Sequence, residues 1–112
     1  MEKRLREFEE LVLLSVLVAK DDAYGVSIQR ILEKDAGRPV LLGPIYTALD
    51  RLSQKGLVQS ELGSPMPVRG GRRKRLYQLT PAGVAAVTNA RRIRDTMWSK
   101  IDPEIPEGGG LK

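Results

Sequence analysis

Basic side chains cluster at positions 69–75 and are the clearest candidates for chemistry in this sequence. Five of these seven positions are basic: Arg69, Arg72, Arg73, Lys74 and Arg75. Guanidinium and ammonium groups gathered in this way suit the phosphates of nucleic acids or an anionic membrane surface. The alternative is a solvated, charged loop without a ligand. Which interpretation holds depends on the helices and strands that position this cluster.

The chain has no histidine and no cysteine. Ser-His triads, histidine acid–base chemistry, thiolate ligands and the common zinc sites therefore have no candidates. A disulfide framework is excluded as well. We predict no catalytic residues, no metal site and no cofactor. A small hydrolase built on carboxylates, Lys, Tyr or Ser is a distant alternative, because no matched constellation of these residues is visible.

Length and charge favour one small domain with an anionic partner. The 112 residues suit a single compact domain, and the formal net charge is +5. The apolar run at 11–19 is about half the length needed to cross a bilayer. Acidic residues precede the run and Lys20-Asp21-Asp22 follows it, which argues against a signal peptide. We expect a cytoplasmic protein with no membrane partner.

Three helices are expected in the first half of the chain. The first covers 4–19, and its positions 11–18 are apolar except for Ser15. A helix that is apolar all round is buried all round, so part of its surface needs cover from a second subunit. The second helix covers 24–36, where Gly37 is placed to end it. A short extended piece at 40–42 follows.

The third helix has the clearest boundaries. Gly43 is predicted as its N-cap, Pro44 lies in its first turn, and Gly56 follows its end. Its apolar face is formed by Ile45, Leu49 and Leu52. Its opposite face carries hydrogen-bonding side chains, namely Thr47, Asp50, Arg51 and Gln54, with Tyr46 on the flank. The helix alone does not distinguish a recognition surface from an ordinary solvated face.

Two strands and a last helix complete the pattern. The strands are expected at 57–62 and 74–79, joined by the Gly- and Pro-rich loop 63–73, and the basic cluster spans the end of this loop and the start of the second strand. Thr80-Pro81 predicts the start of a helix that runs to about residue 101. Its apolar stripe contains Ala86, Ala90, Ile93 and Met97. The Pro- and Gly-containing segment 102–112 is predicted to be a flexible tail.

This order of elements predicts a mostly α fold with a small β-hairpin, a winged helix-turn-helix domain followed by a C-terminal dimerisation helix. We divide the chain into a DNA-binding domain at 1–80, a dimerisation helix at 81–101 and the tail at 102–112. In such a fold the second helix of the helix-turn-helix unit, here 43–56, enters the major groove. The basic loop 63–75 would grip phosphates as the wing. The alternative is a winged-helix module that binds protein, since a fold does not fix a function.

The residues also resemble the PadR family of bacterial transcriptional regulators. The matching motifs are Tyr24-Gly25, Ile45-Tyr46 with Leu49 and Arg51-Leu52, Gly56-Leu57-Val58, Gly70-Gly71-Arg72-Arg73-Lys74, Tyr77, and Leu79-Thr80 with Gly83. They cover about residues 8–85. This chain departs from the family in the recognition helix, where Pro44-Ile45-Tyr46-Thr47 replaces the frequent Thr-Leu-Tyr-Pro.

The resemblance implies a dimeric winged-helix repressor without enzymatic activity. It implies that residues like Tyr24, Tyr46 and the basic wing approach DNA, and that the first and last helices dimerise. Some members of the family release DNA when they bind aromatic or drug-like effectors. The single C-terminal helix places this chain with the short members.

We therefore expect three partners: a double-stranded DNA operator, a second copy of the chain and a small aromatic effector. The residues expected to bind DNA are Tyr24, Tyr46, Thr47, Arg51, Arg72, Arg73 and Lys74. Those expected in the dimer interface are Leu11, Leu14, Val18, Ala86, Ala90, Ile93, Met97 and Trp98. The effector pocket is assigned to Trp98 and Arg94.

Several of these residues have structural alternatives. A tyrosine suits the edge of a core, where its ring is buried and its hydroxyl stays wet. This interpretation is preferred for Tyr77 and stays open for Tyr24 and Tyr46. Trp98 would then fill the dimer core, and Arg94 would reach solvent along its apolar stem.

Overall fold

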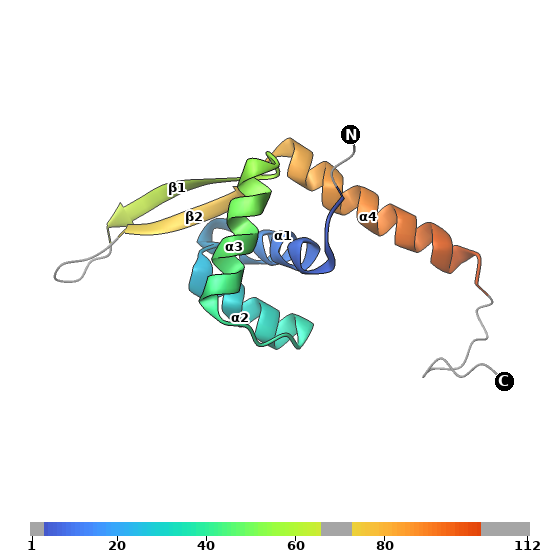
Figure 1. The fold of residues 1–112 in the computed structure, drawn as a ribbon, viewed down its shortest axis with the longest axis horizontal. Coiled ribbons are helices and arrows are strands. Elements are labelled where there is room, and N and C mark those ends of the chain that lie inside the picture. The colour runs from blue at the N-terminus through green and yellow to red at the C-terminus, as the bar shows by residue number, and fades with distance from the viewer. Residues whose placement is uncertain (1–3, 66–72, 102–112) are drawn as a thin grey trace.

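Three helices form the body of the structure, with a hairpin on one side and a fourth helix on the other (Figure 1). A computed structural model of the chain describes residues 4–65 and 73–101. The elements in chain order are α1 (Glu7–Ala19), the 3₁₀ turn η1 (Lys20–Asp22), α2 (Gly25–Ala36), α3 (Leu42–Gln54), β1 (Val58–Pro65), β2 (Arg73–Leu79) and α4 (Pro81–Ser99). This is the predicted mostly α fold with a small β-hairpin.

The core lies between the first three helices. Its largest fully buried side chains are Val12 and Leu13 of α1, Ile28 and Leu32 of α2, and Ile45, Leu49 and Leu52 of α3. Each fully buried side chain of this size contributes about 1.5–3 kcal/mol of transfer free energy. Since α3 turns its apolar face inward, its polar face is held outward in a fixed orientation.

The hairpin is attached to this body along one edge. Strands β1 and β2 pair antiparallel, with Val58 opposite Leu79 and Ser60 opposite Tyr77. The Tyr77 backbone N–H donates a hydrogen bond of 2.8 Å to the Ala23 carbonyl oxygen, between η1 and α2. Val58 and Tyr77 are buried against the core. The base of the wing is thus fixed beside the start of α2.

Helix α4 starts on the body and then leaves it. The Thr80 hydroxyl oxygen accepts a hydrogen bond of 3.1 Å from the Gly83 N–H, so the predicted cap is confirmed. Gly83 and Val87 are the buried residues of this helix, and every residue from 91 to 100 is exposed. The distal half of α4 has no cover within the described part of the protomer.

Some predicted boundaries are wrong by one to three residues. The first helix begins at Glu7, not at residue 4, because the Glu9 carboxylate accepts the Arg6 N–H at 3.0 Å and caps the helix there. Leu41, not Gly43, is the N-cap of α3. Pro44 is therefore the third helical residue, and it fits because the first N–H groups of a helix have no intrahelical partner.

Other boundaries are close to the prediction. Gly37 and Gly56 have the expected left-handed backbone, with φ of +61° and +74°. The first strand runs to Pro65, three residues beyond the expected end, and a register irregularity lies between Leu62 and Pro65. The last helix ends at Ser99 instead of about residue 101. The predicted tail, 102–112, lies outside the described residues.

Candidate nucleic-acid interface

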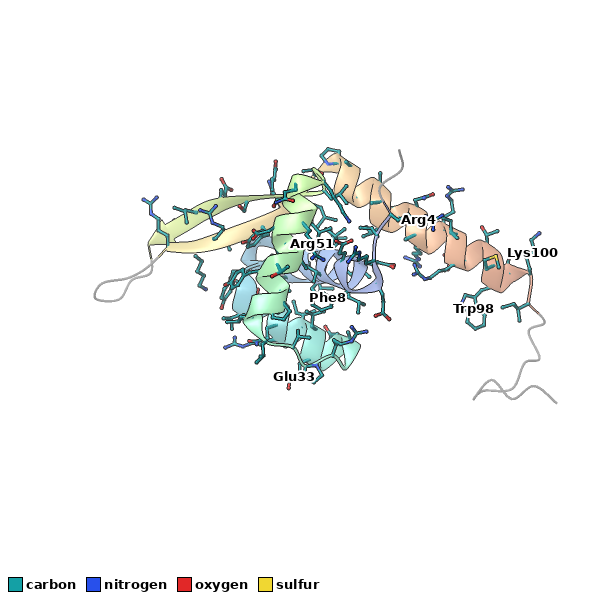
Figure 2. All side chains as sticks on the ribbon, viewed as in Figure 1. Arg4, Phe8, Glu33, Arg51, Trp98 and Lys100 are labelled. Carbon is teal, nitrogen blue, oxygen red and sulfur yellow. The ribbon has the colours of Figure 1, made fainter. Side chains whose placement is uncertain are left out.

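The outer face of α3 is polar and open to solvent. Its side chains Thr47, Asp50, Arg51 and Gln54 are all exposed, as the sequence pattern indicated. Tyr46 and Arg51 lie at opposite edges of this face, because successive residues of an α-helix are rotated by about 100°. Figure 2 shows Arg51 on the part of α3 that lies in front of α1.

Tyr46 is held at one edge by the start of α2. A Cβ atom at Gly25 would collide with the hydroxyl oxygen and the ring of Tyr46. The absence of a side chain at Gly25 therefore lets Tyr46 pass close over the α2 backbone. Tyr46 remains 43% exposed in this position. Tyr24, the N-cap of α2, directly precedes Gly25 in the chain, so two of the predicted DNA-binding tyrosines lie at the same junction.

Lys74 joins this junction from the hairpin. Its Nζ lies 4.1 Å from the centroid of the Tyr24 ring and 3.8 Å from the Asp22 Oδ1. Part of its charge is therefore balanced by a carboxylate and by the face of an aromatic ring. Lys74 can fix the wing to the helical body as well as face a phosphate.

Arg73 and Arg75 lie on the opposite face of β2 from Lys74. Successive side chains of a strand alternate between its two faces, so these arginines share the face of Tyr77. Both are exposed, and Arg75 Nη1 donates a hydrogen bond of 3.1 Å to the Ser60 hydroxyl oxygen. Arg75 does not belong to the predicted site, although strand alternation places it on the same face as Arg73. Arg72, which was predicted, lies outside the described residues.

Tyr77 belongs to the core edge, as preferred from the sequence. It is 8% exposed. Burial raises the pKa of its hydroxyl, and the neighbouring Tyr46 and Asp50 add to this rise. Tyr46 and Asp50 belong to α3. The ring of Tyr77 therefore connects the hairpin to the edge of α3 that carries Tyr46.

Thr47 and Arg51 border the other edge of α3. Together with Arg6, Phe8 and Pro44 they line an open groove of about 550 Å³ between the start of α1 and α3. The predicted DNA-binding residues of α3 are thus divided between its two edges, with Tyr46 on one and Thr47 and Arg51 on the other. Arg6 was not predicted, because nothing in the local sequence shows that the chain before α1 returns to α3.

The residues assigned to the dimer interface fall into two groups. Leu14, Val18, Ile93, Met97 and Trp98 are exposed, with Trp98 67% exposed near the free end of α4 (Figure 2). Leu11, Ala86 and Ala90 are half-buried. Leu11 and Ala86 pack against the core of their own protomer.

The two residues assigned to an effector pocket lie in different surroundings. Arg94 Nη1 forms an ion pair of 2.9 Å with Glu10 Oε1 of α1. Arg94 also lines a groove between α1 and α4 with Ala90 and Ile93, and the residues lining this groove do not include Trp98. Within one protomer the structure therefore does not bring the two side chains into one pocket.

Neither a membrane-spanning segment nor a metal site is found in 4–65 and 73–101. No helix in these ranges combines the length and the apolar character needed to cross a membrane. Over the same ranges, no three acidic, histidine or cysteine side chains come together in a way that could hold a metal ion.

Comparison with known proteins agrees with this geometry. The model of the transcriptional regulator PadR-like family matches residues 13–89. The transcriptional regulator Rv3488 of Mycobacterium tuberculosis is 37% identical over 100 residues, which cover 87% of this chain and 89% of that protein.

Solved structures share the fold. A chain from the complex structure of hsRosR-S4 is 31% identical, with a TM-score of 0.64 over 83% of this chain and 73% of that chain. A PadR family transcription regulator from Clostridium difficile is 26% identical, with a TM-score of 0.62 over 82% of this chain and 92% of that chain. The winged-helix topology, the family match and these relatives lead to one conclusion: the chain belongs to the PadR-like family of transcriptional regulators.

Proposed function

We infer that this regulator binds a specific DNA operator as a homodimer and represses transcription. One observation carries the DNA-binding part of this proposal. The solvent-exposed polar face of α3 lies beside a strand whose exposed arginines, Arg73 and Arg75, extend from the same hairpin face as Tyr77. A polar helix next to a basic hairpin can enter the major groove while the hairpin follows the phosphate backbone. The repressor role rests on the resemblance to PadR regulators.

The two kinds of contact are assigned to different residues. Thr47 and Arg51 of α3 are proposed to meet base edges, which carry sequence information. Arg72, Arg73 and Lys74 of the wing are proposed to meet phosphates, which fix the position of the protein. Tyr24 and Tyr46 lie between these groups and would contact the backbone or a base. Residues 1–80 would thus form the DNA-binding domain.

The dimer is proposed to form through α1 and α4, with 81–101 as the dimerisation helix. The exposed apolar residues Leu14 and Val18 of α1 and Ile93, Met97 and Trp98 of α4 support it. Apolar side chains in such numbers are expected to be covered by another surface. A two-fold dimer would present two α3 helices to two half-sites of a palindromic operator.

An effector is the finest part of the proposal. In a two-fold dimer the distal halves of two α4 helices would bring both Trp98 side chains towards the interface. A flat aromatic molecule between them would release DNA only if it bound the DNA-incompetent arrangement more tightly. Arg94, held by Glu10 in the protomer, would have to exchange that ion pair for an anionic group of the effector.

DNA binding is tested by measuring affinity and its salt dependence for two duplexes of equal length. One duplex is taken from the region flanking the gene for this chain, and the other is its scrambled sequence. Arg73→Ala should weaken binding to both and lower the salt slope by about one for each phosphate that the variant no longer neutralises. Thr47→Ala and Arg51→Ala should instead reduce the difference in binding affinity between the gene-flanking duplex and the scrambled duplex.

Two results would contradict the proposal. If Arg73→Ala and Arg72→Ala leave the DNA affinity and its salt slope unchanged, the wing does not contact DNA. Equally weak binding of the wild-type chain to both duplexes, even at low salt, would favour a winged-helix module that binds a protein. Arg92→Ala serves as control, because this exposed arginine lies on α4 away from the recognition face.

A further inference from the structure

The segment before α1 is fixed against the end of the recognition helix. The Glu9 carboxylate is 3% exposed, and its Oε1 accepts the Arg6 backbone N–H at 3.0 Å and Lys55 Nζ at 2.8 Å. Lys55 is the C-cap of α3 and also donates to the Arg4 carbonyl oxygen at 3.4 Å. Residues 4–6 are therefore held beside α3 by backbone and ionic contacts at both ends.

Glu9 adds no net negative charge to this surface. Its burial opposes ionisation, but the hydrogen bonds from Lys55 and the Arg6 backbone outweigh burial and lower the pKa of its carboxyl group. The carboxylate is therefore ionised at neutral pH and is balanced by Lys55, with a smaller electrostatic contribution from the Arg6 guanidinium. The groove next to it keeps two exposed guanidinium groups, Arg6 and Arg51, which form no ion pair within the described residues.

These two charges lie on the edge of α3 that faces away from the wing. Tyr46 marks the edge towards the wing, because it packs over Gly25 at the start of α2 and adds to the raised pKa of Tyr77 in β2. Arg6, Thr47 and Arg51 mark the other edge. A helix in the major groove, about 12 Å wide, has a phosphate backbone on each side. The wing can reach only one of these backbones.

We propose that Arg6 is a phosphate-binding residue that holds the DNA backbone on the side of α3 opposite the wing. The recognition helix is then held between two basic contacts, one from the hairpin and one from the start of α1. Glu9 is the positioning residue of this contact, because its carboxylate fixes the backbone of Arg6 against Lys55. The proposal rests on the DNA binding inferred above and adds a contact to it.

The test compares Arg6→Ala, Arg6→Lys and Arg92→Ala in the full chain. Binding to the gene-flanking duplex and to its scrambled counterpart is followed by anisotropy between about 50 and 200 mM salt. Arg6→Ala should lower the salt slope by about 0.9 for each phosphate left without its cation, which is about eightfold in affinity at 0.1 M salt. The loss should be equal for both duplexes, since phosphates carry no sequence information. Arg6→Lys should keep the slope, because an ammonium group also neutralises a phosphate.

The outcomes separate this proposal from the one it rests on. If Arg6→Ala keeps the slope of Arg92→Ala while the wild type binds with a steep slope, DNA binding stands and the Arg6 contact is wrong. If the wild type has no salt-dependent affinity for either duplex, both proposals fall. Circular dichroism of each variant checks that the fold is intact, and a loss in Arg6→Ala that Arg6→Lys also shows would point to packing instead of charge.

Discussion

The contact between Gly25 and Tyr46 shows how the absence of one side chain can orient a residue that is proposed to contact DNA. Any Cβ at position 25 would overlap the Tyr46 hydroxyl and ring. Tyr46 is 43% exposed, so its ring has room to turn outward into solvent. If it did so, it would lose its contact with the backbone at Gly25. Gly25 therefore shapes the proposed DNA-binding surface without belonging to it.

Gly25→Ala should displace Tyr46 and weaken DNA binding. The clash is with the far end of a half-exposed side chain, so the loss of folding stability should lie near the lower end of the about 1–3 kcal/mol that overpacking a core costs. In a Tyr46→Ala background, Gly25→Ala should lower the free energy of unfolding much less, because the side chain with which the new Cβ collides has been removed. A double-mutant cycle on urea unfolding measures the coupling. Additive effects of the two substitutions would show that the glycine is required for another reason.

The sequence predicts part of the proposed DNA-binding surface from local residue patterns, but not all of it. The exposed face of α3 followed from helical spacing, and burial of Tyr77 followed from its place in a strand. Strand alternation places Arg73 and Lys74 on different faces, but the predicted strand begins only at residue 74 and so does not include Arg73. Arg6 could not be found, because its place beside α3 depends on Glu9 and Lys55, which are 46 residues apart.

The first turn of α1 connects this helix to three other elements. Glu7 pairs with Arg38 after α2 at 2.7 Å, Glu9 pairs with Lys55 after α3 at 2.8 Å, and Glu10 pairs with Arg94 of α4 at 2.9 Å. The Glu7 pair is exposed and contributes little. The Glu9 pair is the most buried of the three at its carboxylate, so its loss should be felt most.

Glu9→Gln should lower the free energy of unfolding by about 1.5–3 kcal/mol at pH 7, the usual contribution of a hydrogen bond to a charged group. The folded-state pKa of Glu9 is lowered from its ordinary value near 4.5. The stabilisation is therefore complete above that value and is lost as pH falls through the folded pKa. The gap in unfolding free energy between wild type and variant should therefore narrow only below the ordinary value near 4.5, and it should close as pH falls through the lowered pKa of the folded state.

The control for this prediction is Glu33→Gln, an exposed glutamate on α2 (Figure 2). It removes the same charge and should leave the unfolding free energy within about 0.5 kcal/mol. A gap between wild type and Glu9→Gln that stays constant from pH 7 to pH 3 would mean that the ionised carboxylate is not what stabilises the fold.

At the scale of elements, the sequence predicted helix ends well where a side chain or a glycine marks them. Thr80-Pro81, Gly37 and Gly56 are such marks. The start of α3 was misplaced because Leu41 caps it through an extended backbone alone, with no side-chain hydrogen bond. Gly43-Pro44 gave a stronger local signal, although both residues lie inside the helix.

At the scale of the whole molecule, apolar side chains of α1 and α4 lie without cover among the described residues of the protomer. Figure 1 shows α4 extending away from the three-helix body, and its distal side chains Ile93, Met97 and Trp98 are more than half exposed. Leu17 and Val18 of α1 are exposed as well. A monomer with these surfaces in water would be marginal, which is the physical basis for proposing a dimer.

Met97→Glu should weaken the dimer about tenfold or more, because a charge in an apolar interface is costly. Sedimentation at micromolar concentration should show a dimer for the wild type and a shift towards monomer for the variant. Thr96→Glu is the control, since this neighbouring side chain lies away from the apolar stripe in a groove with Arg92 and Asp95. A wild-type chain that sediments as a monomer would contradict the proposed assembly.

The effector prediction also belongs to the assembled molecule, because Trp98 and Arg94 are not in one pocket of the protomer. If two Trp98 rings face each other across the two-fold axis, a planar aromatic compound should quench their fluorescence in a saturable way. The same titration, followed with labelled DNA, should release the duplex. Trp98 is the only tryptophan, so the signal has a single source in each subunit.

Three variants make the result decisive. Trp98→Ala should abolish release because the ligand loses its stacking surface, and it is compared at a protein concentration at which sedimentation shows the variant to be a dimer. Arg94→Gln should weaken anionic aromatic compounds more than neutral ones, since it removes the charge that would leave Glu10 for the ligand. Lys100→Gln, a charge change near the end of α4, should affect neither. Saturable quenching without release of DNA would leave a binding site that is not a switch. No response across a broad panel would support the alternative in which Trp98 fills the dimer core.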